Sequence, residues 1–336
     1  MADHVLVIGA GSVGKRHMQN LQEQGCTVSA VDPRPDRLDE ARTLVDLNYD
    51  FNALQQVEHL WDNFSGVVVA TPPIFHVEQT ITALNNNKPT LLEKPLTTTL
   101  GNAETLLNYT ERSPTTPVLL GYTYRWWPPL NEFRNRLKRG VVGQAYHAKF
   151  VMSAHLADWH PWERYQDFFM ASKHLGGGAL LDESHFLDLL LWFFGAPRTI
   201  FAKVEKISNL EIETDDNVDI VASYSDGLRV FIHLDLYGRP HEKYISVTGE
   251  DGTLDWRFEP NCVRQCSTGA HDWTEEYYDL ERNDMFAALT ADFIKVMNGT
   301  GAIRCTVQDG VRVLRIIEAC RESAKTGREI EIGWAD

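Results

Sequence analysis

Four ionisable side chains stand at the start of one of the most apolar segments of the chain, LLDESHFLDLLLWFFG at residues 180–195. Steps of three residues place Asp182, His185 and Asp188 along one side of a helix whose other sides are apolar. A helix that is apolar nearly all round is buried, and buried polar groups need hydrogen-bond partners or water. The pattern indicates either a small polar cavity that serves a ligand or a core histidine paired with Asp188. In the first case His185 can accept a proton near neutral pH.

The start of this helix has its own signals. Asp182 is a plausible N-cap, and Glu183 suits the first turn, where negative charge meets the positive end of the helix dipole. Three consecutive glycines at residues 176–178 predict a flexible lead-in to the helix. Capping alone is a sufficient explanation for Glu183.

A glycine-rich turn lies near the N-terminus, in VLVIGAGSVGKRH. Gly9, Gly11 and Gly14 have the G-x-G-x-x-G spacing between a predicted strand and a predicted helix. The first glycine permits a tight turn, the second lets the backbone approach a pyrophosphate, and the third lets helix and strand pack closely. The amides at the start of the helix, at Ser12 and Val13, then face the anion. The turn predicts a dinucleotide site.

An acidic residue follows at a suitable distance. Asp32 closes the second predicted strand, 18 residues beyond Gly14 (32 − 14). Its carboxylate can accept hydrogen bonds from both ribose hydroxyls, which favours NAD over NADP. Arg34 and Arg37 stand close by in the sequence, and either could reach a 2′-phosphate, so NADP remains possible.

A lysine ends another apolar run, PTLLEKP, whose last residues are Glu93, Lys94 and Pro95. In a doubly wound sheet, ligands bind outside the carboxyl ends of the strands. Lys94 is expected near the nicotinamide end of the cofactor, in a turn that Pro95 restricts. The alternative is an ordinary solvated lysine in a loop.

The scaffold for these candidates is predicted to be an α/β fold with two domains. Over residues 1–121, short apolar runs alternate with helical patterns, which predicts a doubly wound parallel sheet of the Rossmann type. Over residues 122–336 the runs are longer and alternate more strictly, with turns such as Ser-Asp-Gly, which predicts a mainly antiparallel sheet with one free face. Two helices close the chain, and the second should end at Gly327.

The composition narrows the class of protein. The chain has 336 residues, 43% of them hydrophobic, and a formal charge of −15. Such an acidic surface repels polyanions, which argues against nucleic acid as a partner but not against a phosphorylated small molecule. No run approaches the ~18 apolar residues of a membrane helix, and no basic leader precedes the first strand. The five scattered cysteines predict neither disulfides nor a metal site, so we expect a cytoplasmic protein without a metal.

Several motifs occur together in the order seen in a known family. The glycine turn, ATPPIFH at 70–76, the Glu-Lys-Pro turn and GGGALLDESHFLD at 176–188 resemble the glucose–fructose oxidoreductase / inositol dehydrogenase family, often written Gfo/Idh/MocA. The resemblance spans nearly the whole chain, including TVQDGVRVLRIIEACRESAKTGREI near its end. It implies an N-terminal Rossmann domain and a C-terminal α/β domain for substrate binding, whose large open sheet often mediates homodimers or homotetramers.

The resemblance also implies roles for single residues. Lys94 becomes the active-site lysine, and His185 becomes the general base on a substrate hydroxyl. The further residues implied at the cofactor are Thr71, Pro72, His76 and Glu93. His185 and Asp188 match the family pattern Asp-x-x-x-His-x-x-Asp, whereas Asp182 precedes His185 by three residues rather than four. Asp182 either reaches the substrate as a catalytic residue or only caps the helix.

Two stretches are predicted to line the substrate site. GYTYRWWPP follows the last strand of the first domain, and Tyr122 and Arg125 are expected to approach nicotinamide and substrate. ADWHPWERY offers His160, Trp162 and Arg164, which suit a sugar because an indole covers C–H groups while charged arms bind hydroxyls or phosphate. The same loop could instead be a lid or an interface patch. Its D-W-H-P-W-E sequence resembles a family branch of bacterial surface-sugar pathways, which makes a nucleotide-activated sugar a candidate substrate.

The resulting hypothesis is an NAD(P)-dependent oxidoreductase that transfers hydride between nicotinamide and a secondary hydroxyl or ketone. The substrate would be a cyclic polyol, a sugar or a nucleotide sugar, for example that of a UDP-sugar 3-dehydrogenase. The alternative is a dinucleotide-binding redox sensor without turnover, because a fold does not determine a function. A sensor does not need both Lys94 and His185 at one substrate atom.

Overall fold

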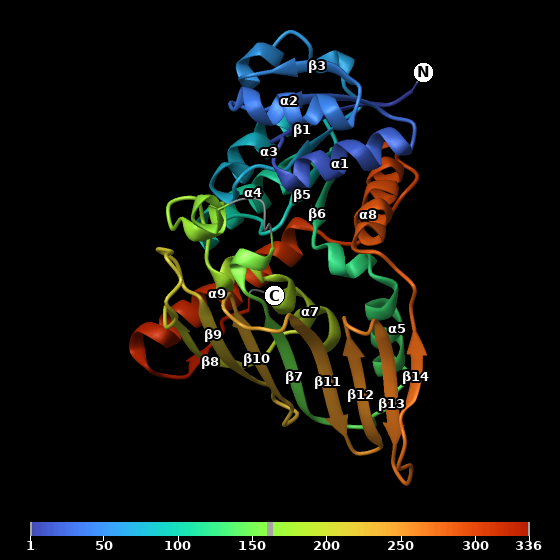
Figure 1. Cartoon of the computed structure of the whole chain (residues 1–336), viewed down its shortest axis with the longest axis vertical. Coiled ribbons are helices and arrows are strands. Elements are labelled where there is room, and N and C mark those ends of the chain that lie inside the picture. The colour runs from blue at the N-terminus through green and yellow to red at the C-terminus, as the bar shows by residue number, and fades with distance from the viewer. Residues whose placement is uncertain (1, 160–163, 335–336) are drawn as a thin grey trace. The chain divides into compact units, whose positions relative to one another are not determined.

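The computed structural model of the chain describes residues 2–159 and 164–334 and divides into two compact units (Figure 1). The units are Met1–Trp126 with Glu281–Val311, and Trp127–Leu280 with Arg312–Asp336. Each unit is built around one β-sheet. Among the residues just given, no helix is both long and apolar enough to cross a membrane.

All six strands of the first unit run parallel, in the order β3-β2-β1-β4-β5-β6. The strands are β1 (His4–Ile8), β2 (Thr27–Val31), β3 (Leu47–Phe51), β4 (Gly66–Val69), β5 (Thr90–Glu93) and β6 (Val118–Gly121). Apart from β3, they are nearly fully buried, as expected of strands covered on both faces. This confirms the predicted Rossmann sheet, whose strand order reverses between β1 and β4, where such sheets bind their ligands.

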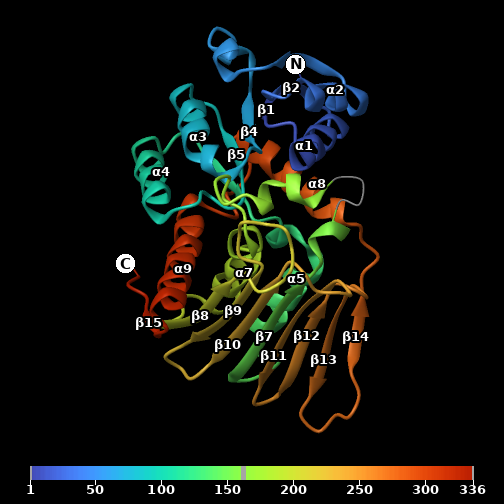
Figure 2. The ribbon, with the colours of Figure 1, turned by 60° about the vertical axis from the view of Figure 1, so that its left-hand side comes forward.

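Helices cover both faces of this sheet. Figure 2 shows α1 and α2 on one side of the strands and α3 and α4 on the other. The helices of the unit are α1 (Ser12–Glu23), α2 (Pro35–Leu44), α3 (His76–Asn85), α4 (Leu100–Arg112) and α8 (Arg282–Met297). Met18 and Leu21 of α1 are completely buried, because its apolar stripe faces the strands.

The segment Glu281–Val311 returns to the first unit, although the sequence analysis placed it in the second domain. Its helix α8 packs against α1, where Asn283 and Asn20 exchange hydrogen bonds of 2.9 and 3.3 Å. Beyond the helix, Cys305 O accepts a hydrogen bond of 3.0 Å from Leu120 N in the edge strand β6. These contacts join residues far apart in the chain, so no local sequence pattern predicts them.

The second unit contains a nine-stranded sheet in the order β14-β13-β12-β11-β7-β10-β9-β8-β15. The strands are β7 (Ala145–Ser153), β8 (Thr199–Glu205), β9 (Asn217–Ser223), β10 (Arg229–Asp235), β11 (Glu242–Gly249), β12 (Gly252–Arg257), β13 (Cys262–Ser267), β14 (Thr274–Tyr277) and β15 (Ile330–Glu331). Neighbouring strands are antiparallel except β7 and β10, which run parallel. This confirms the expected large, mainly antiparallel sheet.

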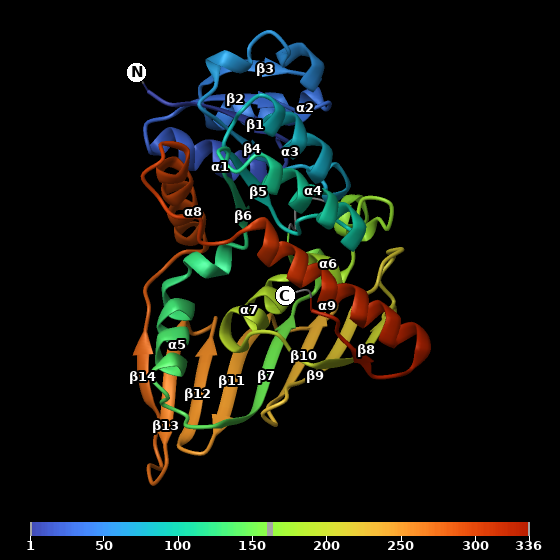
Figure 3. The same cartoon turned by 180° about the vertical axis from the view of Figure 1, so that it is seen from behind.

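Helices lie on one face of this sheet, as Figure 3 shows from behind the view of Figure 1. They are α5 (Pro128–Lys138), α6 (Ala179–Asp182), α7 (His185–Phe194) and the part of α9 (Val307–Thr326) that belongs to this unit. The ring of Phe150 on β7 lies 6.4 and 6.2 Å from those of Phe186 and Phe193 on α7. Helix α9 stops before Gly327, whose φ of +67° confirms the predicted end.

The opposite face of the nine-stranded sheet is exposed. Phe201 and Phe231 keep 38% and 44% of their surface in solvent there. Beside them, His233 lies between two carboxylates, with Nδ1 2.7 Å from Asp219 Oδ1 and Nε2 3.0 Å from Asp235 Oδ2. Because carboxylate oxygens accept, both ring nitrogens donate, and the hydrogen bond with Asp235 raises the pKa of His233 to about 9.

We predict that the contacts of His233 with Asp219 and Asp235 stabilise the fold near neutral pH and no longer do so at alkaline pH. The unfolded pKa is about 6.5, so this stabilisation is fully present below that pH and is lost as pH rises to about 9. Urea unfolding of the wild type and His233→Gln between pH 6 and 9 should show a stability difference that shrinks with pH. His147→Gln, on neighbouring β7, is the control, because burial lowers the pKa of that histidine and no trend is expected above pH 7. A His233 difference independent of pH would contradict this account.

Candidate functional site

The carboxyl end of β1 leads directly into the glycine turn. Gly9 has a φ of +99°, and a Cβ there would lie 2.5 Å from Ala70 O, so no side chain fits. A Cβ on Gly14 would lie 1.8 Å from Gly9 O, which explains how α1 starts against the strand. A Cβ on Gly11 would meet only Arg37 Nη1, at 3.9 Å. The turn is closed toward the protein and open at Gly11, where a pyrophosphate can approach.

The first turn of α1 contains Ser12 and Val13 and carries no acidic side chain. The first amides of a helix have no partner within the helix, and together with the helix dipole they form an anion site. The residues present therefore fit the pyrophosphate of a dinucleotide.

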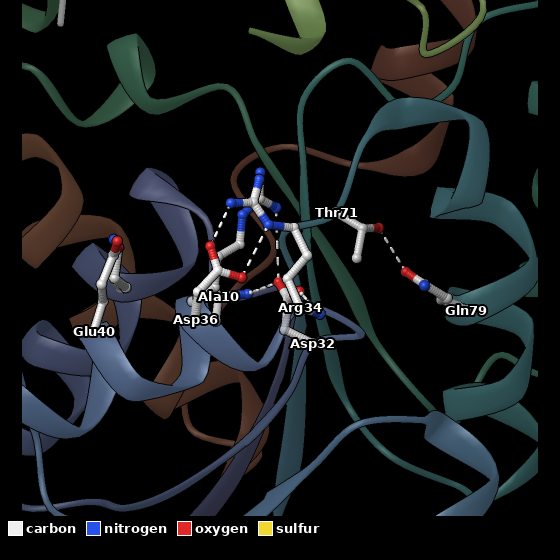
Figure 4. A network of polar contacts seen from close by, with 9 residues as sticks. Ala10, Asp32, Arg34, Asp36, Glu40, Thr71 and Gln79 are labelled. Carbon is white, nitrogen blue, oxygen red and sulfur yellow. Dashed lines mark hydrogen bonds and ion pairs between the residues drawn. The ribbon is translucent and has the colours of Figure 1, made fainter. Parts of the chain in front are cut away.

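Asp32 follows β2 and is held in place by backbone amides (Figure 4). Its Oδ2 accepts from Ala10 N at 2.8 Å, and its Oδ1 accepts from Arg34 N at 2.9 Å. Only 2% of the residue is exposed, so the carboxylate has a fixed orientation. Each carboxylate oxygen has a second lone pair, which suits the hydroxyls of an adenosine ribose.

The two arginines beside Asp32 have carboxylate partners. The guanidinium of Arg34 donates two hydrogen bonds to Asp36, which raises the pKa of Arg34 and lowers the pKa of Asp36 (Figure 4). Arg37 Nη1 lies 3.8 Å from Asp32 Oδ2. These pairs reduce the positive charge available to a 2′-phosphate, which favours NAD.

The turn after β4 contains Thr71 and Pro72. Thr71 Oγ1 donates to Gln79 Oε1 at 2.6 Å (Figure 4). His76 is fully buried, with Nε2 2.8 Å from Thr71 O and Nδ1 2.8 Å from Pro95 O. The enclosed ring joins the turns after β4 and β5 from inside, and the contact of His76 with the cofactor that the resemblance implied stays a prediction.

Strand β5 ends on Glu93, and the half-buried Lys94 follows. Glu93 is 6% exposed, with Oε1 2.7 Å from His17 Nε2, and its Oε2 accepts from Lys94 N at 3.2 Å. The Lys94–Pro95 peptide is cis. A buried carboxylate thus anchors the backbone of the residue that is predicted to act on substrate.

The parallel pairing of the strands brings the candidate site residues of the first unit to the carboxyl end of the sheet. Gly9, Asp32, Thr71 and Lys94 follow the carboxyl ends of β1, β2, β4 and β5. The sequence predicted this for the glycine turn, Asp32 and the lysine, because all strands of a parallel sheet end on the same side.

Tyr122 and Arg125 lie beyond β6 and are buried. Arg125 Nη1 donates to Arg304 O at 3.0 Å and to Asp309 Oδ2 at 3.2 Å. Arg304 Nη2 in turn donates to Arg125 O at 2.9 Å. These contacts give Arg125 a structural task in holding the returning segment, and substrate contact by Tyr122 and Arg125 stays a prediction.

In the second unit, residues 179–194 contain two helices instead of the one helix expected after Asp182. Helix α6 ends at Asp182 and α7 begins at His185, so Asp182 is not an N-cap, which corrects the expectation. Across the break the amides of Ser184 and Phe186 bond to carbonyls three residues back. Residues three apart lie above one another in such 3₁₀ geometry, so we expect Asp182 and His185 on one side despite their shortened spacing.

The glycine run before α6 is a buried, fixed turn rather than the flexible lead-in expected from its composition. A Cβ on Gly177 would lie 2.3 Å from Met170 O, and Gly178 has a φ of +107°. Asp215 closes the turn: its O accepts from Ala179 N at 3.0 Å, and its Oδ2 accepts from Leu180 N at 2.8 Å. The start of the segment that carries Asp182 and His185 is therefore set by a carboxylate.

Two predicted sugar-binding residues, His160 and Trp162, lie outside the described residues. Arg164 is exposed directly before the turn Tyr165–Asp167, and its substrate contact stays a prediction. In the described part of the chain, no group of three His, Cys, Asp or Glu side chains is arranged to hold a metal ion.

His17 and Asp215 were not among the residues that the sequence predicted to matter for the site. His17 stands three residues after Gly14, on the side of α1 that carries Met18 and Leu21 into the core, and a histidine among buried positions was the available signal. Asp215 has no such signal, because its partners Ala179 and Leu180 lie 35 or more residues away.

Comparison with known proteins agrees with this geometry. Residues 4–122 match the oxidoreductase family with an NAD-binding Rossmann fold, and residues 130–255 match the GFO/IDH/MocA C-terminal domain. The rhizopine catabolism protein MocA of Rhizobium meliloti is 25% identical over 329 residues, covering 94% of this chain and 93% of MocA.

Two solved structures share the fold over their full length and all of this chain. Levoglucosan dehydrogenase in complex with NADH superposes with a TM-score of 0.88 at 16% identity. The WlbA dehydrogenase of Bordetella pertussis, in complex with NADH and UDP-GlcNAcA, superposes with a TM-score of 0.80 at 18% identity. The chain belongs to the Gfo/Idh/MocA family of NAD-binding oxidoreductases and is an enzyme of this class.

We predict that Asp32→Asn weakens NADH binding and reduces the preference for NADH over NADPH. Removing the charge from a buried carboxylate that accepts hydrogen bonds costs about 1.5–3 kcal/mol, which is roughly a 10- to 100-fold rise in Kd. Fluorescence titration with both reduced cofactors measures the change. Asp39→Asn is the control, since Asp39 pairs with Arg42 at the surface. Equal NADH affinity in Asp32→Asn and wild type would contradict the assignment.

Proposed function

We propose that the protein catalyses the reversible oxidation of a secondary hydroxyl of a cyclic polyol, a sugar or a nucleotide sugar. Bound NAD supplies the hydride acceptor. The observation that carries the proposal is the anchored turn at Glu93: it brings Lys94 to the same sheet edge as the glycine turn and Asp32. In an ordinary solvated loop, the backbone amide of a lysine is not expected to donate to a buried carboxylate.

The two proposed catalytic side chains divide the work between them. His185, half-buried at the start of α7, takes the hydroxyl proton as general base. Lys94 donates a hydrogen bond to the same oxygen and stabilises the negative charge that develops there. Since Lys94 belongs to the first unit and His185 to the second, the convergence of both on one oxygen is part of the proposal.

Asp182 is proposed to assist at the substrate rather than to cap a helix. It is 6% exposed, and we infer from the 3₁₀ tightening after α6 that it lies above His185 on the same side of the chain. A carboxylate in that position can accept a hydrogen bond from a neighbouring substrate hydroxyl.

The substrate class is proposed from two sources. Levoglucosan dehydrogenase and the WlbA complex with UDP-GlcNAcA share the fold, and inositol 2-dehydrogenases are among the relatives of this chain. The loop with His160, Trp162 and Arg164 suits sugar hydroxyls or a phosphate. We propose a homodimer or homotetramer formed through the exposed sheet face that carries Phe201 and Phe231.

The substrate is to be found by a screen that follows reduced-nicotinamide absorbance with NAD and with NADP. The panel contains myo-inositol, D-xylose, levoglucosan and UDP-GlcNAcA, which represent the proposed substrate classes. Turnover with at least one panel compound is expected, and a chain that binds NADH but turns over none of them would favour the sensor alternative.

We predict that Lys94→Ala lowers kcat about 10²- to 10³-fold with the best panel substrate, as typical of a lost hydrogen-bond donor to an oxygen that gains negative charge. The Kd for NADH should stay within about threefold, because the glycine turn and Asp32 are untouched. Lys88→Ala is the matched control, since Lys88 precedes the other end of β5. Wild-type turnover in Lys94→Ala would refute the proposed role.

A further inference from the structure

Two completely buried histidines contact the turn at Glu93–Pro95, one on each side of Lys94. His17 reaches the residue before the lysine, and His76 reaches the residue after it. Neither ring contacts solvent, so neither can act on a substrate directly. Both rings contact the turn that carries Lys94.

His17 fixes the side chain of Glu93. Its Nε2 lies 2.7 Å from Oε1, and Oε2 of the same carboxylate accepts from Lys94 N at 3.2 Å. Gly121 approaches from β6, where a Cβ would lie 3.2 Å from Oε1, so the carboxylate has little room to move. His17 Nδ1 is buried and has no hydrogen-bond partner among the described residues, so the ring is held through Nε2, which donates because a carboxylate oxygen accepts.

The ring of His17 packs against a residue of the returning segment Glu281–Val311. Phe286 of α8 packs edge-on against it at a centroid distance of 5.9 Å. The preceding residue, Arg16, lies over the same phenyl ring at 5.0 Å. The returning segment therefore contributes to the placement of a residue that contacts Glu93.

His76 fixes the backbone of the same turn. Nδ1 lies 2.8 Å from Pro95 O, and Nε2 lies 2.8 Å from Thr71 O. Burial lowers the pKa of His76, and the contacts with Thr71 O and Pro95 O oppose that shift because both carbonyl oxygens accept hydrogen bonds. The ring thus spans the turn after β4 and the turn after β5.

Each histidine also belongs to an element that faces the cofactor. His17 lies in the second turn of α1, whose first amides form the pyrophosphate site. His76 opens α3, directly after the Thr71 turn. The cofactor-binding elements and the lysine turn are thus joined by buried hydrogen bonds.

We propose that His17 and His76 are positioning residues that hold the Glu93–Pro95 turn so that the Lys94 amine meets the substrate oxygen. This inference rests on the proposed function of Lys94. Misplacing a catalytic group by about 1 Å can cost about 100-fold in rate, so loss of either brace should lower kcat without weakening cofactor binding.

The test uses the different reach of Gln and Asn. A Gln amide nitrogen stands close to the position of Nε2, whereas an Asn amide nitrogen stands close to that of Nδ1. His17→Gln keeps a donor for Glu93, and His17→Asn loses it. His76→Asn keeps a donor for Pro95 O, and His76→Gln loses it. The rank order of the two variants should be opposite at the two sites.

The measurements are kcat and KM for the best panel substrate and Kd for NADH, all on the full chain. We expect His17→Asn and His76→Gln to lose about 10- to 100-fold in kcat, with Kd for NADH within about threefold of wild type. His17→Gln and His76→Asn should recover most of the loss. Asn20→Ala, equally buried on α1 but bonded to Asn283, should keep wild-type kcat.

A double variant separates positioning from a general weakening of the fold. In His17→Asn/Lys94→Ala the kcat should be that of Lys94→Ala within about threefold, because the histidine acts through the lysine. A full additional loss, or the same rank order of Gln and Asn at both sites, would overturn the inference. If Lys94→Ala is slow while all histidine variants are normal, only this inference falls. If Lys94→Ala turns over normally, the proposed function and the inference fall together.

Discussion

Parallel pairing of the first sheet is the constraint on which the candidate site depends. When β1, β2, β4 and β5 run in one direction, their carboxyl ends meet at one edge, whatever the separation of their residues in the chain. The glycine turn, Asp32 and Lys94 come together for that reason. The turn itself is possible because Gly9 and Gly14 allow backbone atoms to approach where any Cβ would clash.

A second theme is the use of carboxylates as anchors for backbone amides. Asp32 accepts from Ala10 N, and Glu93 accepts from Lys94 N. In the second unit, Asp215 does the same for Leu180 N, at the start of the segment that leads to His185. Burial makes an unbonded carboxylate costly, so each of these groups holds its segment in one conformation. The segments that carry the proposed chemistry are therefore held rigidly by polar contacts.

The sequence predicted what local rules control. Strand and helix periodicity was sufficient for the parallel and antiparallel sheets, and the spacing of Gly9, Gly11 and Gly14 was sufficient for the tight turn between β1 and α1. It did not predict what long-range contacts control: the return of Glu281–Val311 to the first unit and the Glu93 anchor at His17. The apolar run after residue 180 hid a helix break, since apolar periodicity does not distinguish α from 3₁₀ geometry over a few residues.

The central claim is that Lys94 and His185 act on one alcohol oxygen. It is tested most directly by a crystal structure of the enzyme with NADH and the best panel substrate. The account predicts Lys94 Nζ and a ring nitrogen of His185 both within about 2.6–3.2 Å of the same hydroxyl oxygen. That oxygen should be on the carbon that faces C4 of the nicotinamide. Lys94 and His185 on different substrate atoms, or one of them turned away from the substrate, would contradict it.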